Sequence, residues 1–122
     1  VFKPVTVDGR VMIGGGFFEP VPYRHLLGRA DIVIGVDVVG APEGDGTHVP
    51  SRMDSLFGAS QLMMQAVISM QLQLGPPQIF LRPAVGRFRV LDFLKAREVL
   101  EATAPVKEQL KRALEREIAL RS

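Results

Sequence analysis

The residues of this chain that could take part in chemistry begin with a run of three glycines, Gly14-Gly15-Gly16. Such a run exposes backbone N–H groups and lets the backbone bend sharply. It can therefore line a binding cleft or cradle a phosphate. The glycines lack the G-x-G-x-x-G spacing of a dinucleotide site, and no clear helix start follows them. We interpret Gly14, Gly15 and Gly16 as a sharp turn beside a cleft, with nucleotide binding as the weaker alternative.

A carboxylate and two imidazoles are the other groups suited to chemistry. Asp37 lies near the end of an apolar, β-branched run, and ligand crevices form at the carboxyl ends of strands in open α/β sheets. A carboxylate there can be catalytic, but we favour a structural role in which Asp37 hydrogen-bonds the loop that follows. His25 and His48 have no partner at the spacing of metal ligands, so we interpret both as surface residues. The sequence predicts no metal site and no cofactor.

Composition excludes several classes of function. The 122 residues suit one domain, and the absence of cysteine favours a reducing compartment, so we expect the cytoplasm. A net charge of +2 and 7% aromatic residues argue against nucleic acid as a partner. No apolar run approaches the roughly 18 residues of a membrane-spanning helix. The start at Val1 has neither an initiator methionine nor a signal peptide, which indicates a cut inside a longer protein.

The elements that would position these residues begin with a hairpin. Residues 1–22 predict two short strands and the glycine turn, with Asp8-Gly9 supplying the positive φ angles of a type I′ turn. Residues 23–102 predict alternating helices and strands. Within them, residues 31–39 are almost continuously apolar, which is typical of a strand covered on both faces.

The rest of the chain predicts more helices than strands. Ser51 and Asp54 form a capping box for a helix that ends at Gly75. A short strand at 78–82, a helix at 93–102 and a terminal helix within residues 103–122 follow. The order predicts an α/β fold with a partial layered sheet flanked by helices. The hairpin and the two further strands make a thin sheet for so many helices. The first helix has a broad apolar face that we expect in the core, made by Met53, Leu56, Phe57, Met63, Met64, Val67 and Ile68. Its methionines, Met53, Met63, Met64 and Met70, offer the alternative of an acyl-chain groove.

Four segments, in this order, carry a family resemblance. The first is DGRVMIGGGFFEPVP at residues 8–22, and the second is GRAD followed by IGVDV at residues 28–38. The third is IFLRP at residues 79–83, and the fourth is phenylalanine-rich, with Phe88, Leu91-Asp92-Phe93 and Ala96-Arg97. Together they resemble signature blocks of bacterial patatin-like phospholipases over roughly residues 3 to 102. The resemblance implies the C-terminal part of a patatin-like fold.

The resemblance also implies a chemistry for the complete protein. In this family a Ser–Asp dyad hydrolyses acyl esters, with the serine in a G-x-S-x-G elbow and a glycine-rich segment as oxyanion hole. Both lie N-terminal to the matched region, and no G-x-S-x-G occurs in this chain. Anchored on Pro20-Val21-Pro22, the match puts Gly14 at the position of the catalytic aspartate. A shifted register, in which Asp8 is that aspartate, remains the alternative.

The sequence therefore predicts a fragment of a serine-dependent lipid acyl hydrolase that is inactive alone. Its substrate would be a phospholipid or another long-chain ester, with peripheral membrane contact. A non-catalytic patatin-like module that binds lipid or protein is the main alternative, and an unrelated nucleotide-binding domain is a distant third. We expect the chain to associate with itself or with the missing N-terminal half, because its apolar strand and strand edges need partners.

Overall fold

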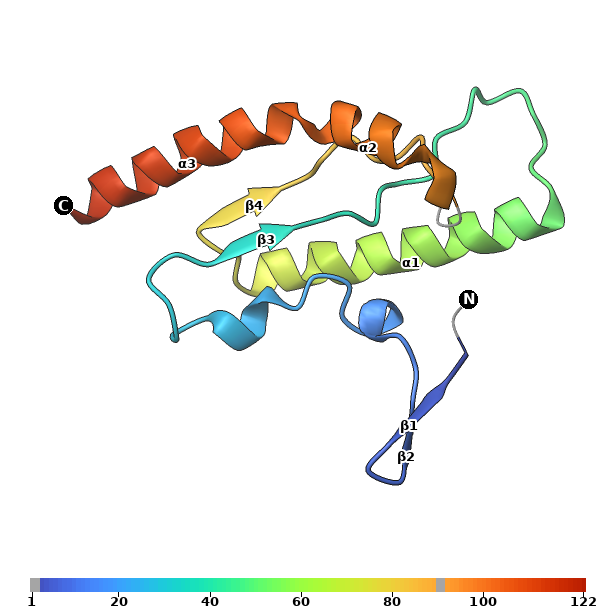
Figure 1. Ribbon diagram of the computed structural model, residues 1–122, viewed down its shortest axis with the longest axis horizontal. Helices are drawn as coiled ribbons and strands as arrows, with labels where there is room; N and C mark the ends of the chain where they lie inside the picture. Colours follow the sequence, from blue (N-terminus) through green and yellow to red (C-terminus); the bar gives the residue numbers. More distant parts are fainter. Residues whose placement is uncertain (1–2, 90–91) are drawn as a thin grey trace.

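The structure is a computed structural model that describes residues 3–89 and 92–122. Leu91 of the fourth motif and the first two residues lie outside the described residues. The described part is a mixed α/β chain with two separate two-stranded sheets and three α-helices (Figure 1). The α/β class predicted from the sequence is confirmed.

The N-terminal hairpin forms as predicted but stands apart. Strand β1 (Val5–Val7) pairs antiparallel with β2 (Arg10–Met12). The turn residues Asp8 and Gly9 have φ angles of 48° and 76°, as a type I′ turn requires. The hairpin projects from the rest of the chain, and every residue of both strands is exposed (Figure 1). It is a sheet of its own, so the expectation of one thin sheet that includes the hairpin is wrong.

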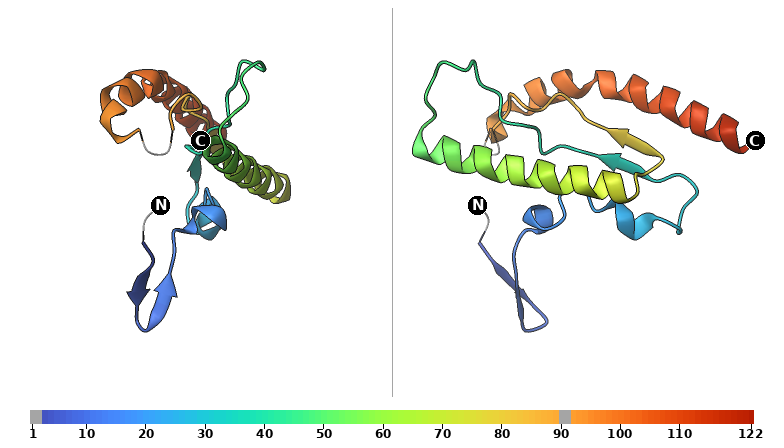
Figure 2. Two further views of the ribbon diagram at one scale, coloured as in Figure 1. Left: turned by 90° about the vertical axis from the view of Figure 1, so that its right-hand side faces the viewer. Right: turned by 180° about the vertical axis from the view of Figure 1, so that it is seen from behind.

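The main body has three layers. Strands β3 (Ile34–Val36) and β4 (Ile79–Leu81) pair in parallel. They lie between helix α1 (Arg52–Leu74) and helix α3 (Pro105–Arg121), which can be followed in Figures 1 and 2. A 3₁₀ turn (Phe93–Lys95) and helix α2 (Ala96–Thr103) lead into α3. This arrangement agrees with a partial layered sheet flanked by helices.

The core lies between α1 and the sheet. Ile68 of α1 is completely buried in a cluster with Val21, Tyr23 and Val33. The Tyr23 hydroxyl donates a hydrogen bond of 2.9 Å to the Gly75 carbonyl at the end of α1. These contacts hold the proline-containing segment and the short 3₁₀ helix Tyr23–Leu26 against the main body.

The prediction of a strand over residues 31–39 that is covered on both faces is wrong in the length of the strand and in the burial of its side chains. Only Ile34–Val36 is a strand, because its partner β4 is equally short. Ile34 and Val36 are 37% and 41% exposed, whereas Gly35 between them is buried. The cause is that α3 packs on β4 rather than on β3, and within the described residues no further strand pairs with β3. A glycine is needed at position 35, since a Cβ there would lie 2.9 Å from the Phe80 ring.

Helix α1 has the predicted ends and part of the predicted core face, because Ile68 is completely buried and Phe57, Met64 and Val67 are half-buried. The Ser51 hydroxyl accepts the Asp54 N–H at 3.1 Å, and Gly75 follows the last turn. Leu56 and Met63, expected in the core, are 62% and 63% exposed. Residues 55–74 contain no charged side chain, so no side of the helix is marked as the one that faces water. The pattern of apolar residues therefore did not identify the whole face that packs on the sheet.

The chain exposes more surface than a compact monomer of its size. Its accessible surface is 9674 Å². A folded monomer of 13.4 kDa exposes about 6,500 Å² by the usual scaling of surface with mass. The projecting hairpin, the half-covered β3 and the outer side of α1 all contribute to the excess.

Candidate functional site

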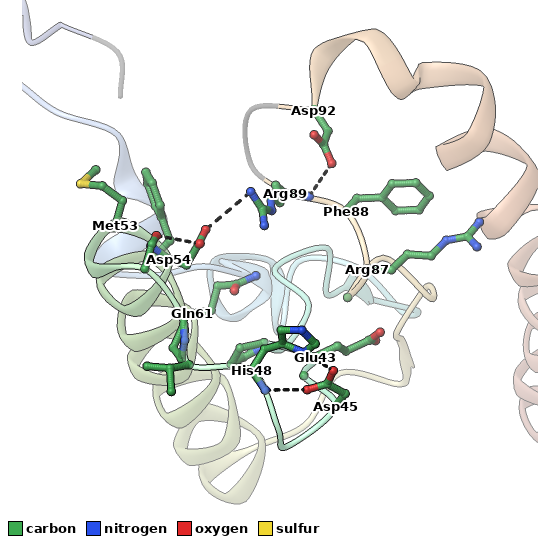
Figure 3. Close-up of a pocket in the computed structure, with 18 residues that line it drawn as sticks. Glu43, Asp45, His48, Met53, Asp54, Gln61, Arg87, Phe88, Arg89 and Asp92 are labelled. Carbon is green, nitrogen blue, oxygen red and sulfur yellow. Dashed lines mark hydrogen bonds and ion pairs between the residues drawn. The ribbon is translucent and has the colours of Figure 1, made fainter.

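Two adjoining pockets lie where the carboxyl ends of β3 and β4 continue into loops, the place where open α/β sheets bind ligands. The larger, of about 940 Å³, lies between the loop at residues 42–50, the first turns of α1, residues 86–89 and Asp92 (Figure 3). The smaller, of about 420 Å³, lies between the strand ends, α1 and α2. We call them the polar pocket and the apolar pocket.

Two arginines, Arg87 and Arg89, line the polar pocket together with four carboxylates, those of Glu43, Asp45, Asp54 and Asp92. The Arg89 guanidinium lies 3.6 Å from a carboxylate oxygen of Asp54, and its backbone N–H donates to Asp92 at 3.0 Å (Figure 3). Arg87 lies over the ring of Phe88, 4.9 Å from its centre. The Arg89 side chain is 77% exposed, so its ion pair with Asp54 is weak and its charge stays accessible to a ligand.

An aspartate organises the loop that forms the outer wall of the polar pocket. Asp45 accepts hydrogen bonds from the backbone N–H groups of Thr47 at 2.8 Å and His48 at 3.0 Å. It also contacts the His48 Nδ1 at 2.5 Å (Figure 3). These bonds, led by the one from Thr47, lower the pKa of Asp45 well below its ordinary value. The carboxylate therefore keeps its charge, and its hold on the loop, through the ordinary range of aspartate titration.

A serine and an aspartate are also close in this pocket, at the start of α1. The Ser51 hydroxyl donates to the Asp54 carboxylate at 2.7 Å and accepts the Asp54 N–H. These two bonds are those of a helix cap. We assign the pair to capping rather than to catalysis, because both groups are already used in starting the helix.

The apolar pocket continues the polar one. Gln61, Phe88 and Arg89 line both pockets, so the two adjoin through these three side chains. The rest of the apolar pocket is made almost entirely by aliphatic residues from the strand ends and α2, namely Val38, Val39, Pro83, Val85, Val99 and Thr103. An apolar space that opens beside the exposed guanidinium of Arg89 can hold an amphiphile whose polar head pairs with that arginine.

Asp37 lies next to this region without lining either pocket. Its carboxylate is 3% exposed and accepts hydrogen bonds from the Val39 N–H and the Gln65 side chain, both at 3.0 Å. The Arg82 Nε lies 3.3 Å away. Gln65 also donates to the Gly40 carbonyl at 2.8 Å. Asp37 thus holds the end of β3 and the start of the following loop against α1, which positions the walls of both pockets.

The other residues singled out in the sequence lie elsewhere. Gly14 precedes the 3₁₀ turn Gly15–Phe17, and a Cβ added at any of the three glycines would meet nothing within 4 Å. Asp8 lies in the turn of the hairpin. None of the glycines, nor Asp8, lines the polar or the apolar pocket. The turn Gly15–Phe17 instead contacts α1.

The two histidines differ in their surroundings. His25 Nε2 lies 2.8 Å from Glu19, on the surface, as the sequence analysis proposed. His48 also has an exposed side chain, but it lines the polar pocket. Sequence reasoning missed this, together with the roles of Arg87 and Arg89. The sequence feature that could have indicated these residues is the pair of arginines on either side of Phe88, in a loop shortly after a predicted strand.

Comparison with protein-family models gives no match, and comparison with curated proteins gives none either. Within residues 3–89 and 92–122, no helix is long and apolar enough to cross a bilayer. In the same ranges, histidine, aspartate and glutamate side chains form no group of three or more that could hold a metal ion.

Proposed function

We propose that this chain is the ligand-binding, C-terminal part of a serine-dependent lipid acyl hydrolase of the patatin-like type, without a nucleophile of its own. The observation that carries the proposal is the apolar pocket that adjoins an arginine-bearing pocket at the carboxyl edge of β3 and β4. The four sequence segments that resemble patatin-like phospholipases give it the reaction class. The substrate is a phospholipid or another long-chain ester, and water is the second substrate.

The pockets divide the substrate between them. The acyl chain lies in the apolar pocket, where burial of each methylene contributes about 0.8 kcal/mol. A phosphate or carboxylate lies where the two pockets meet, at the exposed guanidinium of Arg89, which can bind it in bidentate fashion. The serine elbow and the oxyanion hole come from an N-terminal half. That half also covers the exposed side of β3.

The exposed hairpin supports a place at the membrane surface. Val11 in the hairpin and Ile13 directly after it are 72% and 73% exposed, and the hairpin stands clear of the main body (Figure 1). Apolar side chains of this kind insert into the headgroup region of a bilayer. We place the protein in the cytoplasm, in peripheral contact with a membrane, where its substrate is found.

This chain alone should not hydrolyse esters. The expectation follows from the missing G-x-S-x-G elbow and from the use of Ser51 and Asp54 as a helix cap. The test is the hydrolysis of a short-chain nitrophenyl ester, compared with the buffer rate. Hydrolysis above that rate, blocked by a serine-directed phosphonate and abolished by Ser51→Ala, would contradict the proposal and make Ser51 the nucleophile.

One observation favours a second candidate, a non-catalytic patatin-like module that binds lipid or a protein partner. Gly14, at the position that matches the family's aspartate, has no side chain to act as a base. The two candidates share the pockets and differ in turnover. The test uses a protein in which this chain is joined to an N-terminal half. If that protein binds a long-chain ester but releases no fatty acid, even after Gly14→Asp, the result favours the binding module.

A further inference from the structure

The outer side of α1 is a long apolar surface that the described part of the chain leaves exposed. Leu56, Met63 and Met70 lie seven residues apart and are 62%, 63% and 63% exposed. Ala59 and Ala66 lie between them and are exposed as well. In Figure 2 (left), α1 forms the boundary of the molecule on the side away from α2 and α3. We call this surface, together with Gln73, the outer face of α1.

The composition of the outer face is that of a buried surface. Residues 55–74 contain no charged side chain, whereas a helix that faces water carries charged residues on its exposed side. The accessible surface of 9674 Å² exceeds that of a compact monomer of this mass by about 3,000 Å². The outer face of α1 contributes to this excess together with the hairpin and β3, and obligate interfaces bury surface of this apolar kind.

The absence of charge also indicates what covers the outer face. A helix that lies on a membrane carries lysines and arginines beside its apolar face, and α1 has none beyond Arg52 in its first turn. A charged protein surface would find no complementary group on it. A second copy of α1 brings an equally uncharged surface of the same length, about 25 Å between residues 56 and 73.

The alternation of large and small residues sets the direction of packing. In an antiparallel pair centred between residues 64 and 65, Met63 of one copy lies beside Ala66 of the other. The same register puts Met70 beside Ala59, and Leu56 beside Gln73. Each large side chain then meets a smaller or flexible one, which lets the two surfaces interdigitate. The antiparallel direction also sets opposite helix dipoles side by side.

We propose that the outer face of α1 packs antiparallel against the same face of a second copy and forms a two-fold symmetric dimer. This inference does not depend on the proposed lipid chemistry. It uses the side of α1 away from the sheet, and none of the residues of the outer face lines either pocket.

Cysteine cross-linking tests the dimer and its direction, because the chain has no cysteine of its own. Met63→Cys, near the two-fold axis, should cross-link to itself under mild oxidation. Leu56→Cys alone should not, since its two copies lie about 25 Å apart along the helix axis. A mixture of Leu56→Cys and Gln73→Cys should give the cross-linked dimer. Leu120→Cys, an 81% exposed site on α3, is the control and should stay monomeric on a denaturing gel.

Sedimentation of the chain without cysteines gives an independent measurement. The unmodified chain should sediment as a dimer, and Met63→Lys should raise the dissociation constant about 100-fold or more, because it places unpaired charge in an apolar interface. Leu120→Lys should leave it unchanged. A monomeric unmodified chain, or self-cross-linking of Leu56→Cys, would overturn the proposal. So would binding of the unmodified chain to phosphatidylcholine vesicles, if Met63→Lys abolished that binding without changing the sedimentation of the protein.

Discussion

Replacing Ile68 with alanine should lower the free energy of unfolding by about 2–5 kcal/mol. Ile68 is completely buried, and its cluster with Val21, Tyr23 and Val33 joins α1 to the sheet. Domains are stabilised by about 5–15 kcal/mol in total, so the loss is a large share. Urea unfolding followed by circular dichroism measures it. The matched control is Ile118→Ala on α3, where the isoleucine is 56% exposed and the expected loss is smaller.

Equal losses for Ile68→Ala and Ile118→Ala would contradict the core described here. That result would mean that the contact between α1 and the sheet contributes no more to stability than the outer side of α3. If a substitution changes how steeply the unfolding free energy falls with urea, and not the midpoint, it has changed the amount of surface that unfolding exposes.

Restoring a carboxylate at the glycine turn should raise ester hydrolysis about 10²–10⁴-fold, the usual contribution of a general base. The change is Gly14→Asp, in a protein that joins this chain to an N-terminal half with a G-x-S-x-G elbow. The structure accommodates it, since Gly14 has a φ of −58° and a Cβ there would meet nothing within 4 Å. The measurement is the rate of fatty acid release from a long-chain ester at saturating substrate.

Asp8→Asn is the matched control for the register of the resemblance. It should leave hydrolysis unchanged, because Asp8 belongs to the turn of the projecting hairpin. If Gly14→Asp is no faster than its parent while Asp8→Asn abolishes hydrolysis, then Asp8 is the base and the match to the family is shifted by the length of the hairpin.

The elements that depend on local signals could be predicted from the sequence. The hairpin turn follows from the positive φ angles that Asp8 and Gly9 accept, and the start of α1 from the Ser51 cap. Pro105 begins α3 as expected. Each of these features is decided within a few residues of the chain, so the residue types alone suffice.

The features that depend on distant partners could not be predicted. The coverage of β3 depends on where α3 packs, which nothing in residues 31–39 encodes. The side of α1 that is buried carries Ile68 in the core and Gln65, whose amide reaches Asp37 and Gly40, while Leu56 and Met63 of the predicted face remain exposed. The polar pocket was missed for the same reason, because His48 and Arg89 are brought together by loops from different parts of the chain.

Calorimetric titration with dodecanoate, below its micelle concentration, measures whether the adjoining pockets bind an acyl chain with an anionic head. Dodecanoate should bind the unmodified chain with one site per chain. Val99→Asp, which puts a carboxylate into the apolar pocket, should weaken binding about 100-fold or more. Leu120→Asp, at an exposed position on α3, should bind as the unmodified chain does. If the unmodified chain does not bind dodecanoate, or if Val99→Asp and Leu120→Asp bind it with equal affinity, then the adjoining pockets are not the site of an acyl chain.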